Sequence, residues 1–292
     1  MDASVVKPPF AWQPLTPRGV AAFARASFGR LLVVQFIIAL LAAAAVVWFL
    51  HEAWFPPIGE AINDLPSRGE IRSGSLDWRG NSPARLSEGR FLAITVDLQH
   101  EGQARSPAHV QIELGQKDVN VFSLLGFVQF NYPRGWVVGF NRVELIPWWG
   151  AWSPPILAIV AGLVVVGLML TWALLATVYC LPVWLLGFFG NRDLSLRGSW
   201  RVAGAALMPG ALLVTAAICA YGSGAFDLIR LAAAGGAHLV IGWGYLIAGP
   251  LSCPPHAAVA GTKANPFVAS AEPQSQPRNG KPDDHRVADR NP

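Results

Sequence analysis

The chain has 292 residues, of which 53% are hydrophobic and only 14% are charged, against about 25% charged residues in ordinary soluble domains. Its mean hydropathy of +0.39 excludes such a domain. The net charge of +4 does not indicate nucleic-acid binding, because the basic residues flank apolar segments and form no stripe interleaved with aromatics. The composition therefore predicts an integral membrane protein.

Residues 1–30 are predicted to be a cytoplasmic segment that ends in a helix at the membrane surface. Thr16 and Pro17 form a helix-start signal, a capping hydroxyl followed by proline at the first helical position. The segment 17–30 combines basic and apolar side chains, which is typical of an interfacial helix; they are Arg18, Val20, Phe23, Arg25, Phe28 and Arg30.

The first predicted transmembrane helix is the apolar run 31–50. A spanning helix needs about 20 apolar residues, because the hydrocarbon core is about 30 Å thick and each residue rises about 1.5 Å. A cleaved signal peptide is the alternative, but the run continues past the small residues at 42–45, which favours a retained signal-anchor. Trp48 and Trp54 are then expected at the far membrane interface, where aromatic rings are favoured.

Residues 51–153 are predicted to form a β-rich domain. After a short helix over 56–66, apolar and polar residues alternate with period two, as in 92–98 and 126–132. This alternation predicts five to seven short antiparallel strands with one apolar face on a core and one polar face in water. A transmembrane barrel is disfavoured, because the strands are few and irregular. The segment contains no cysteine, so it folds without disulfides.

The chain is expected to return to the membrane through an aromatic connection over 147–155. It contains Trp148, Trp149 and Trp152, which are predicted to lie at the interface and, in a second interpretation, to pack the base of the β-rich domain.

Three more spans are predicted within 154–251, at about 156–180, 202–221 and 226–249. Pro182 is expected to end or kink the second of them, and Pro209 to kink the third. Residues 252–292 are rich in Pro, Ser, Asn, Asp, Lys and Arg and are predicted to form a disordered cytoplasmic tail.

Positive charge predicts the orientation of these four spans. Lys and Arg gather before the first span, between the second and third, and after the fourth, whereas the turn at 222–224 carries none. The positive-inside rule then places both termini in the cytoplasm and the domain at 51–153 outside it. The fold class is membrane α + β: four transmembrane helices, with an antiparallel, extracytoplasmic β-rich domain between the first and second.

The fourth span contains the ionisable residues Asp227, Arg230 and His238, which are functional candidates because charges inside a bilayer are costly. Asp227 and Arg230 are three residues apart, and a structural ion pair at the helix start is favoured over a proton relay. His238 is expected to hydrogen-bond to Thr171 or Thr215 across a helix interface, or else to line a polar cavity or bind a proton.

No catalytic residue, cofactor site or metal site is predicted. A metal site built from the acidic and histidine residues of the outer segment is disfavoured, because their spacing matches no ligand motif; these are His51, Glu52, His100, Glu101 and His109. Cys253 and His256 show a C-x-x-H spacing, but a complete four-ligand site is not visible. The sequence also lacks the nucleophile, zinc-protease and nucleotide-binding motifs.

The stretch 65–76, with the sequence LPSRGEIRSGSL, is similar to the strand opening of a bacterial family of polytopic membrane proteins that is classed as a domain of unknown function. The resemblance covers the architecture over about 230 residues, but the sequence over only about a dozen. It implies one helix, an extracytoplasmic β-rich domain and then a helical bundle in a bacterial inner membrane. The family typically carries more spanning helices than this chain, and the resemblance implies no activity.

The sequence favours a non-enzymatic envelope sensor, assembly factor or complex subunit. Its expected partners are the lipid bilayer and an envelope protein that binds the outer domain through the strands at 91–98 or 126–132. The oligomeric state is left open. The alternative is a small transporter or channel component that uses a polar site near His238, and an enzyme acting on lipid or envelope polymer comes third.

Overall fold

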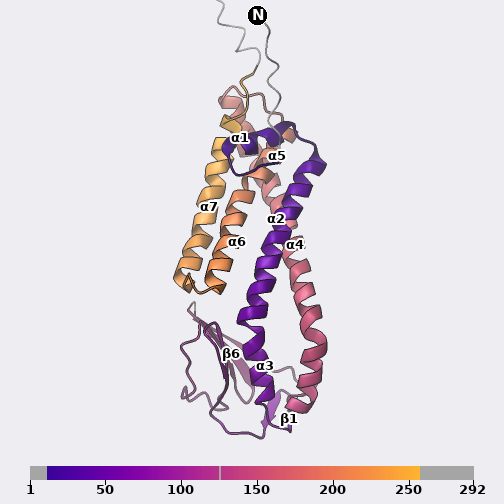
Figure 1. Ribbon diagram of the computed structural model, residues 1–292, viewed down its shortest axis with the longest axis vertical. Helices are drawn as coiled ribbons and strands as arrows, with labels where there is room; N and C mark the ends of the chain where they lie inside the picture. The colour runs from indigo at the N-terminus through magenta and orange to yellow at the C-terminus, as the bar shows by residue number, and fades with distance from the viewer. Residues whose placement is uncertain (1–11, 125, 257–292) are drawn as a thin grey trace, which may run out of the picture. The chain divides into compact units, whose positions relative to one another are not determined.

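The computed structural model describes residues 12–124 and 126–256. These residues form helices and two β-sheets, and four helical segments are long and apolar enough to cross a membrane; these are Phe28–Asn63, Arg142–Phe189, Leu196–Gly222 and Leu228–Leu251. The predictions made for residues 1–11 and for the tail beyond residue 256 lie outside the described residues. Figure 1 shows the helices side by side, with the β-strands near one of their ends.

The segment after Thr16 is divided into two short turns of helix, where the sequence predicted one helix over 17–30. The α-helix α1 (Pro17–Ala22) runs into the 3-10 helix η1 (Phe23–Arg25). A new helix, α2 (Phe28–Ala53), starts after Ser27, whose hydroxyl accepts a hydrogen bond from the Arg30 amide. Val20 and Phe23 are fully buried, so their apolar side chains contact the other helices.

Beyond α2, the short helix α3 (Phe55–Asn63) confirms the helix expected near 56–66. Two sheets follow. The first has the strand order β2-β1-β8 and the second has the order β3-β4-β5-β6-β7. The strands are β1 (Gly69–Arg72), β2 (Ser75–Trp78), β3 (Ala84–Glu88), β4 (Leu92–Val96), β5 (Val110–Leu114), β6 (Asp118–Ser123), β7 (Gly126–Asn131) and β8 (Val137–Gly139).

Two predictions about these sheets are corrected. The described part of the chain holds eight strands, one more than the upper limit expected. The strands are also not all antiparallel, because β4 pairs with β5 in parallel. Parallel neighbours need a connection of about a dozen residues or more, and the loop 97–109 supplies it. This loop carries no helix signal, so a crossover could not be predicted from the sequence.

The five-stranded sheet packs its apolar face against α3. The core at this contact joins Ala61 and Leu65 to side chains from the strands, which are Leu86, Ile94, Val96, Ile112, Leu114 and Val119. The opposite face is polar, as the alternation predicted. It does not simply face water, however, because Thr95, Gln111 and Glu113 are buried. The loop 97–109 covers this face, so the expectation of an open polar face is wrong at these positions.

The helix α4 (Arg142–Phe189) is 48 residues long and contains Pro147, Pro154, Pro155 and Pro182. The connection expected over 147–155 is therefore helical, and Pro182 does not end the helix. Proline removes one backbone donor, but apolar helices tolerate it when their neighbours compensate. The helix continues through the segment 183–189, which the sequence placed outside the second span.

The remaining helices are α5 (Leu196–Ala206), α6 (Met208–Gly222) and α7 (Leu228–Leu251). The helix is interrupted at Leu207, two residues before Pro209, near which the sequence predicted a kink. The helices α6 and α7 lie side by side (Figure 1) and approach closely at Gly210, where a Cβ atom would be 2.7 Å from the carbonyl oxygen of His238. Small residues permit such close packing of apolar helices.

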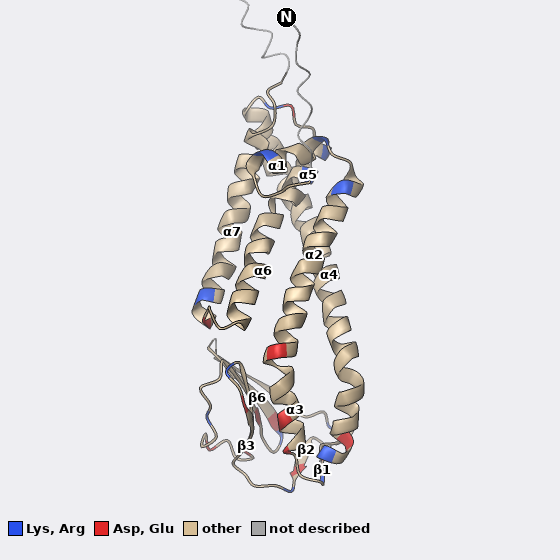
Figure 2. Cartoon of the chain, viewed as in Figure 1, with Lys and Arg blue, Asp and Glu red and all other residues tan. Residues whose placement is uncertain are grey.

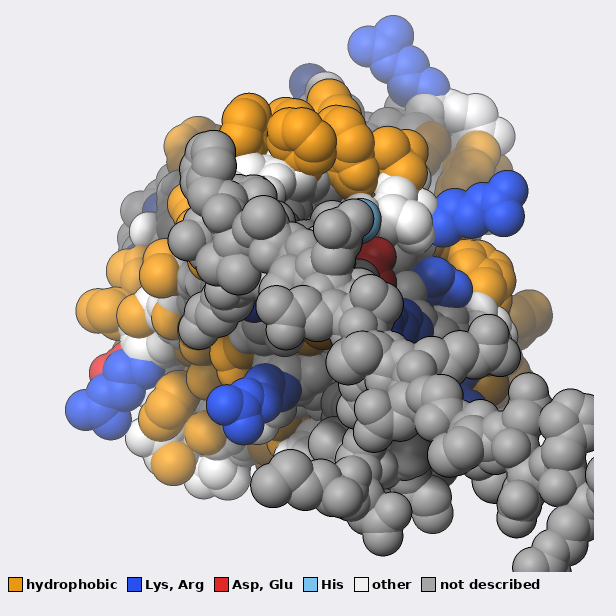
Figure 3. Space-filling model, turned by 90° about the horizontal axis from the view of Figure 1, so that it is seen from above, with side chains coloured by type: hydrophobic (Ala, Val, Ile, Leu, Met, Phe, Trp, Pro, Cys, Tyr) orange, Lys and Arg blue, Asp and Glu red, His pale blue; other side chains and the backbone are white. Residues whose placement is uncertain are grey.

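Charged residues gather at the ends of the helices (Figure 2). The end at which α1 and α5 lie carries mainly Lys and Arg, which also surround this face when it is viewed end-on (Figure 3). Several of these side chains hold the elements together. Arg201 donates to the carbonyls of Ala24 and Ala26, at 2.6 and 2.5 Å, and Arg25 pairs with Asp193 at 2.7 Å.

Candidate functional site

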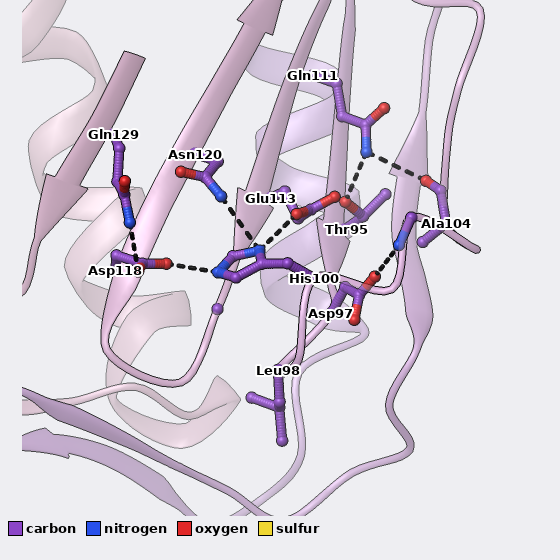
Figure 4. A network of polar contacts seen from close by, with 12 residues as sticks. Thr95, Asp97, Leu98, His100, Ala104, Gln111, Glu113, Asp118, Asn120 and Gln129 are labelled. Atoms are coloured by element: carbon purple, nitrogen blue, oxygen red, sulfur yellow. Dashed lines mark hydrogen bonds and ion pairs between the residues drawn. The ribbon is translucent and has the colours of Figure 1, made fainter. Parts of the chain in front are cut away.

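A row of polar side chains crosses the five-stranded sheet on the face away from α3. The strand register places Thr95, Glu113, Asn120 and Gln129 opposite one another on β4, β5, β6 and β7. Figure 4 shows these side chains together with the loop that covers them. Glu113 is only 1% exposed, and a carboxylate at such a position requires charged or hydrogen-bonding partners.

The loop 97–109 is fixed over this row by side-chain hydrogen bonds. The Asp97 carboxylate accepts from the Gly102 amide at 2.8 Å. The Gln111 side chain accepts from the Ser106 amide at 3.0 Å and donates to the Ala104 carbonyl at 3.1 Å and to the Thr95 hydroxyl at 3.0 Å. These bonds satisfy the amide of Gln111 and hold the loop against the sheet.

His100, at the centre of the network, lies between two carboxylates (Figure 4). Its Nδ1 is 2.7 Å from Glu113 and its Nε2 is 2.7 Å from Asp118. Burial disfavours protonation, but the hydrogen bonds and charges of Glu113 and Asp118 outweigh it and raise the pKa of His100 above its ordinary value of 6.5. An imidazolium donates from both nitrogens and so makes one hydrogen bond to each carboxylate.

This network is suited to holding the loop 97–109 against the sheet. Among residues 12–124 and 126–256, no group of three His, Cys, Asp or Glu side chains could hold a metal ion. The residues considered in the sequence as metal ligands are also separated. His51 pairs with Glu52 at 3.1 Å, whereas His109 contacts α6. One oxygen each of Glu113 and Asn120 is buried and has no hydrogen-bond partner among the described residues.

A second set of contacts joins the β-rich segment to the helices. His109 Nδ1 is 2.5 Å from the hydroxyl of Tyr221 on α6, and the two rings stack. Phe91 packs edge-on against both rings. Burial, and then the charge of Arg90, lower the pKa of His109 below 6.5, with Asp227 acting in the opposite direction. The sequence did not predict this junction, because its members lie far apart in the chain.

A cavity of about 450 Å³ lies beside this junction, between the loop 105–109, the end of β6 and the start of α7. Asp227 and His109 line it. Asp227 is the N-cap of α7, accepting from the Arg230 amide at 2.7 Å, and its carboxylate is 3.9 Å from the Arg230 guanidinium. The pair expected from the sequence is therefore present, and it lies at the start of the helix.

His238 lies on α7 within the apolar bundle. Its Nδ1 hydrogen-bonds to the carbonyl of Gly235 in its own helix, and no bond joins it to Thr171 or Thr215 in the described chain. The Thr215 hydroxyl donates instead to the Ala211 carbonyl at 2.8 Å. His238 and both threonines nevertheless line one cavity of about 450 Å³ among α2, α4, α6 and α7. The sequence had offered a small polar cavity as an alternative; this cavity is mainly apolar.

The five tryptophans singled out in the sequence lie in two places. Trp48 and Trp54 are at the end of α2, and Trp148, Trp149 and Trp152 are on α4. Trp48 rests against Gly222 of α6, and Trp54 lies at the boundary between α2 and α3. Trp149 packs against Phe55 with ring centroids 4.8 Å apart. Trp148 and Trp149 line a cavity of about 230 Å³ beneath the apolar face of the sheet, in keeping with the second interpretation of their role. Trp152 is half-exposed on α4.

Comparisons with known proteins add no relative: no family model matches the chain, and neither a curated protein nor a solved structure matches it. Within residues 12–124 and 126–256, the chain has four helices of membrane-spanning length and apolarity and two β-sheets. The resemblance to bacterial polytopic membrane proteins stays a prediction.

Proposed function

We propose that the chain is a multi-pass protein of a bacterial inner membrane, with both termini in the cytoplasm and residues 51–153 outside it. The basic end formed by α1 and α5 supports this orientation (Figure 2). The length of α4 supports it too. Its 48 residues extend about 70 Å, more than twice the ~30 Å hydrocarbon core, so its first turns project out of the bilayer beside the sheets.

We further propose that the outer segment is a non-enzymatic binding module, an envelope sensor, assembly factor or complex subunit, that recruits a partner protein through β7. The observation that carries this proposal is that all six residues of β7 are exposed. Phe127, Val128 and Phe130 are 64%, 56% and 58% exposed. Val128 and Phe130 pair with Val121 and Val119 of β6, so they extend the apolar face of the sheet beyond the part that packs on α3.

The two edges of the five-stranded sheet differ in a way that supports this assignment. The β3 edge carries Arg85 and Glu88, which form an ion pair, and charged side chains protect an edge from pairing with another chain. The β7 edge has no charged residue. An uncharged, apolar edge strand is suited to the addition of a strand from a partner. The strand at 91–98 is less suited to this role, because β4 lies inside the sheet.

Site-specific photo-crosslinking tests this function. A photoreactive phenylalanine at position 130, in the full chain in cells, is expected to give one discrete adduct with a protein that mass spectrometry identifies. The same group in place of Gln103, an exposed residue of the loop 97–109, is expected to give none.

A pair of lysine variants supplies the matched control. Val128→Lys places a charge on the β7 edge and should abolish the adduct, because edge lysines block strand addition. Val137→Lys changes another exposed valine, on β8, and should leave the adduct intact. An adduct that survives Val128→Lys, or that forms equally from position 103, would contradict binding through β7.

The alternative of a transporter or channel component has less support. Among the described residues that line the cavity beside His238 there is no Asp, Glu, Lys or Arg, and ionisable residues along a path are the usual mark of ion or proton movement through a bilayer.

A further inference from the structure

The cavity beside His238 has the features of a ligand site within the apolar part of the bundle. It is lined by four helices and has a volume of about 450 Å³, within the range of about 300–1,000 Å³ typical of small-molecule sites. An apolar cavity of about 150 Å³ is large enough to bind benzene. The space among α2, α4, α6 and α7 is therefore large enough for a substantial part of a hydrocarbon chain.

The lining excludes ions and charged head groups. It consists mainly of alanine, leucine, valine, isoleucine, glycine and tryptophan side chains, and its polar members are Thr171, Tyr179, Thr215 and His238. A charged ligand would lose its hydration here without gaining a counter-charge, at a large free-energy cost. An apolar ligand with few hydrogen-bonding groups fits this lining.

Two of the polar groups are open to a ligand. Tyr179 and Thr215 already have partners, the indole of Trp243 and the carbonyl of Ala211. No hydrogen bond from the hydroxyl of Thr171 or from Nε2 of His238 is present in the described chain. The carbonyl of Gly235 can only accept, so Nδ1 of His238 carries the proton in that bond. In the neutral imidazole, Nε2 is then an acceptor, and its ligand must supply a donor.

Access to the cavity runs from the side. Leu163, Leu239 and Trp243 line it and are also exposed. In the proposed membrane setting these side chains face lipid, so a chain can enter from the hydrocarbon core without crossing the polar surface.

We propose that this cavity binds the hydrocarbon chain of an uncharged membrane amphiphile whose hydroxyl group donates to Nε2 of His238. The Thr171 hydroxyl provides a second hydrogen-bonding group in the same cavity. The proposal depends on insertion of the helices in a membrane, but it does not depend on partner binding by β7. The two are tested by different residues and different probes.

The experiment uses the full chain in lipid nanodiscs and a hexadecanol that carries a photoactivatable diazirine. Labelling is expected in the peptides of α4 and α7 that contain Thr171 and His238. Diazirine-labelled hexadecane should label them about fivefold less at equal concentration, which is the factor expected for the loss of one net hydrogen bond. In His238→Phe the two probes should label equally.

Two glycines of α4 provide a matched pair of variants. Gly167 lines the cavity, whereas Gly162 does not, and a Cβ atom at either position would meet no other atom within 4 Å. Gly167→Leu fills the cavity and should abolish labelling of α7, whereas Gly162→Leu should leave it unchanged. Equal thermal unfolding of the two variants establishes that both are folded.

Three results would overturn the proposal. They are labelling that is unchanged in Gly167→Leu, labelling spread evenly over the lipid-exposed faces of α4, and labelling by the alkane that equals labelling by the alcohol in the natural chain. Loss of the β7 crosslink would not affect any of these results.

Discussion

The imidazole Nδ1 of His109 lies 2.5 Å from the phenol oxygen of Tyr221, and this contact joins the loop after β4 to the end of α6. Phe91 and Phe49 pack around the phenol ring of Tyr221, and Arg90 donates to the carbonyls of Gly224 and Phe226. Residues that are far apart in the sequence therefore form one partly buried contact between the β-rich segment and the turn from α6 to α7.

A double-mutant cycle tests whether this contact stabilises the protein. Tyr221→Phe removes the hydroxyl and leaves Nδ1 of His109 without its partner, which should lower the free energy of unfolding by about 1 kcal/mol. His109→Phe keeps a ring in the stack but removes the same bond. The double variant should be less destabilised than the sum of the single variants, by about 1 kcal/mol. Chemical unfolding in detergent measures the difference, and strict additivity would contradict the contact.

The stability contributed by His109 should fall in acid. Its pKa is lowered below 6.5 in the folded chain by burial and by Arg90, so the unfolded chain binds a proton more readily than the folded chain. As the pH falls through 6.5, protonation therefore favours unfolding. Compared with the non-titrating His109→Phe variant, the natural chain should lose thermal stability between about pH 8 and pH 5. If the difference in thermal stability between the natural chain and His109→Phe did not change with pH, the lowered pKa of His109 would be contradicted.

His100 should have the opposite pH dependence. Its pKa is raised above 6.5, because Glu113 and Asp118 outweigh the effect of its burial, so the folded chain binds the proton more tightly. Its contribution should be complete below pH 6.5 and disappear as the pH rises through the folded pKa. His100→Gln should therefore destabilise the protein most in mild acid. His51→Gln, at a side chain that is 63% exposed, is the control and should have little effect on stability.

At the basic end of the bundle, the hydrogen bonds of Arg201 can be tested separately from its positive charge. Arg201 donates to two backbone carbonyls, Ala24 and Ala26, and a lysine keeps the charge but cannot reproduce this geometry. Arg201→Lys should lower the free energy of unfolding by about 2 kcal/mol. Arg197 is exposed on the same helix, and Arg197→Lys should be neutral. Equal effects of the two variants on the free energy of unfolding would mean that Arg201 contributes its positive charge but not its hydrogen bonds.

The long apolar runs were the most predictable part of the fold. The runs 31–50 and 226–249 correspond to α2 and α7 within a few residues, because hydrophobicity over such lengths specifies a helix directly. Pro182 misled the prediction, because a long apolar helix can continue through a proline when its surroundings compensate for the lost backbone hydrogen bond, which a single sequence does not reveal.

The sequence predicts which residues of the sheet point to its apolar face and which to its polar face, but not which segment covers the polar face. Alternation correctly separated Ile112 and Leu114 from Gln111 and Glu113, yet it could not show that the loop 97–109 covers the polar side. The charged network around His100 and the parallel pairing of β4 with β5 both follow from the path of that loop. His109 and Tyr221 are likewise brought together only by the fold.

Labelling of single cysteines in intact spheroplasts tests the membrane arrangement most directly. With the three natural cysteines replaced by alanine, Gln103→Cys lies on the outer loop and Arg197→Cys at the basic end of the bundle. A membrane-impermeant maleimide should label position 103 in intact spheroplasts, and position 197 only after the membrane is permeabilised. Labelling of position 197 in intact spheroplasts, or of position 103 only after permeabilisation, would contradict the proposed topology.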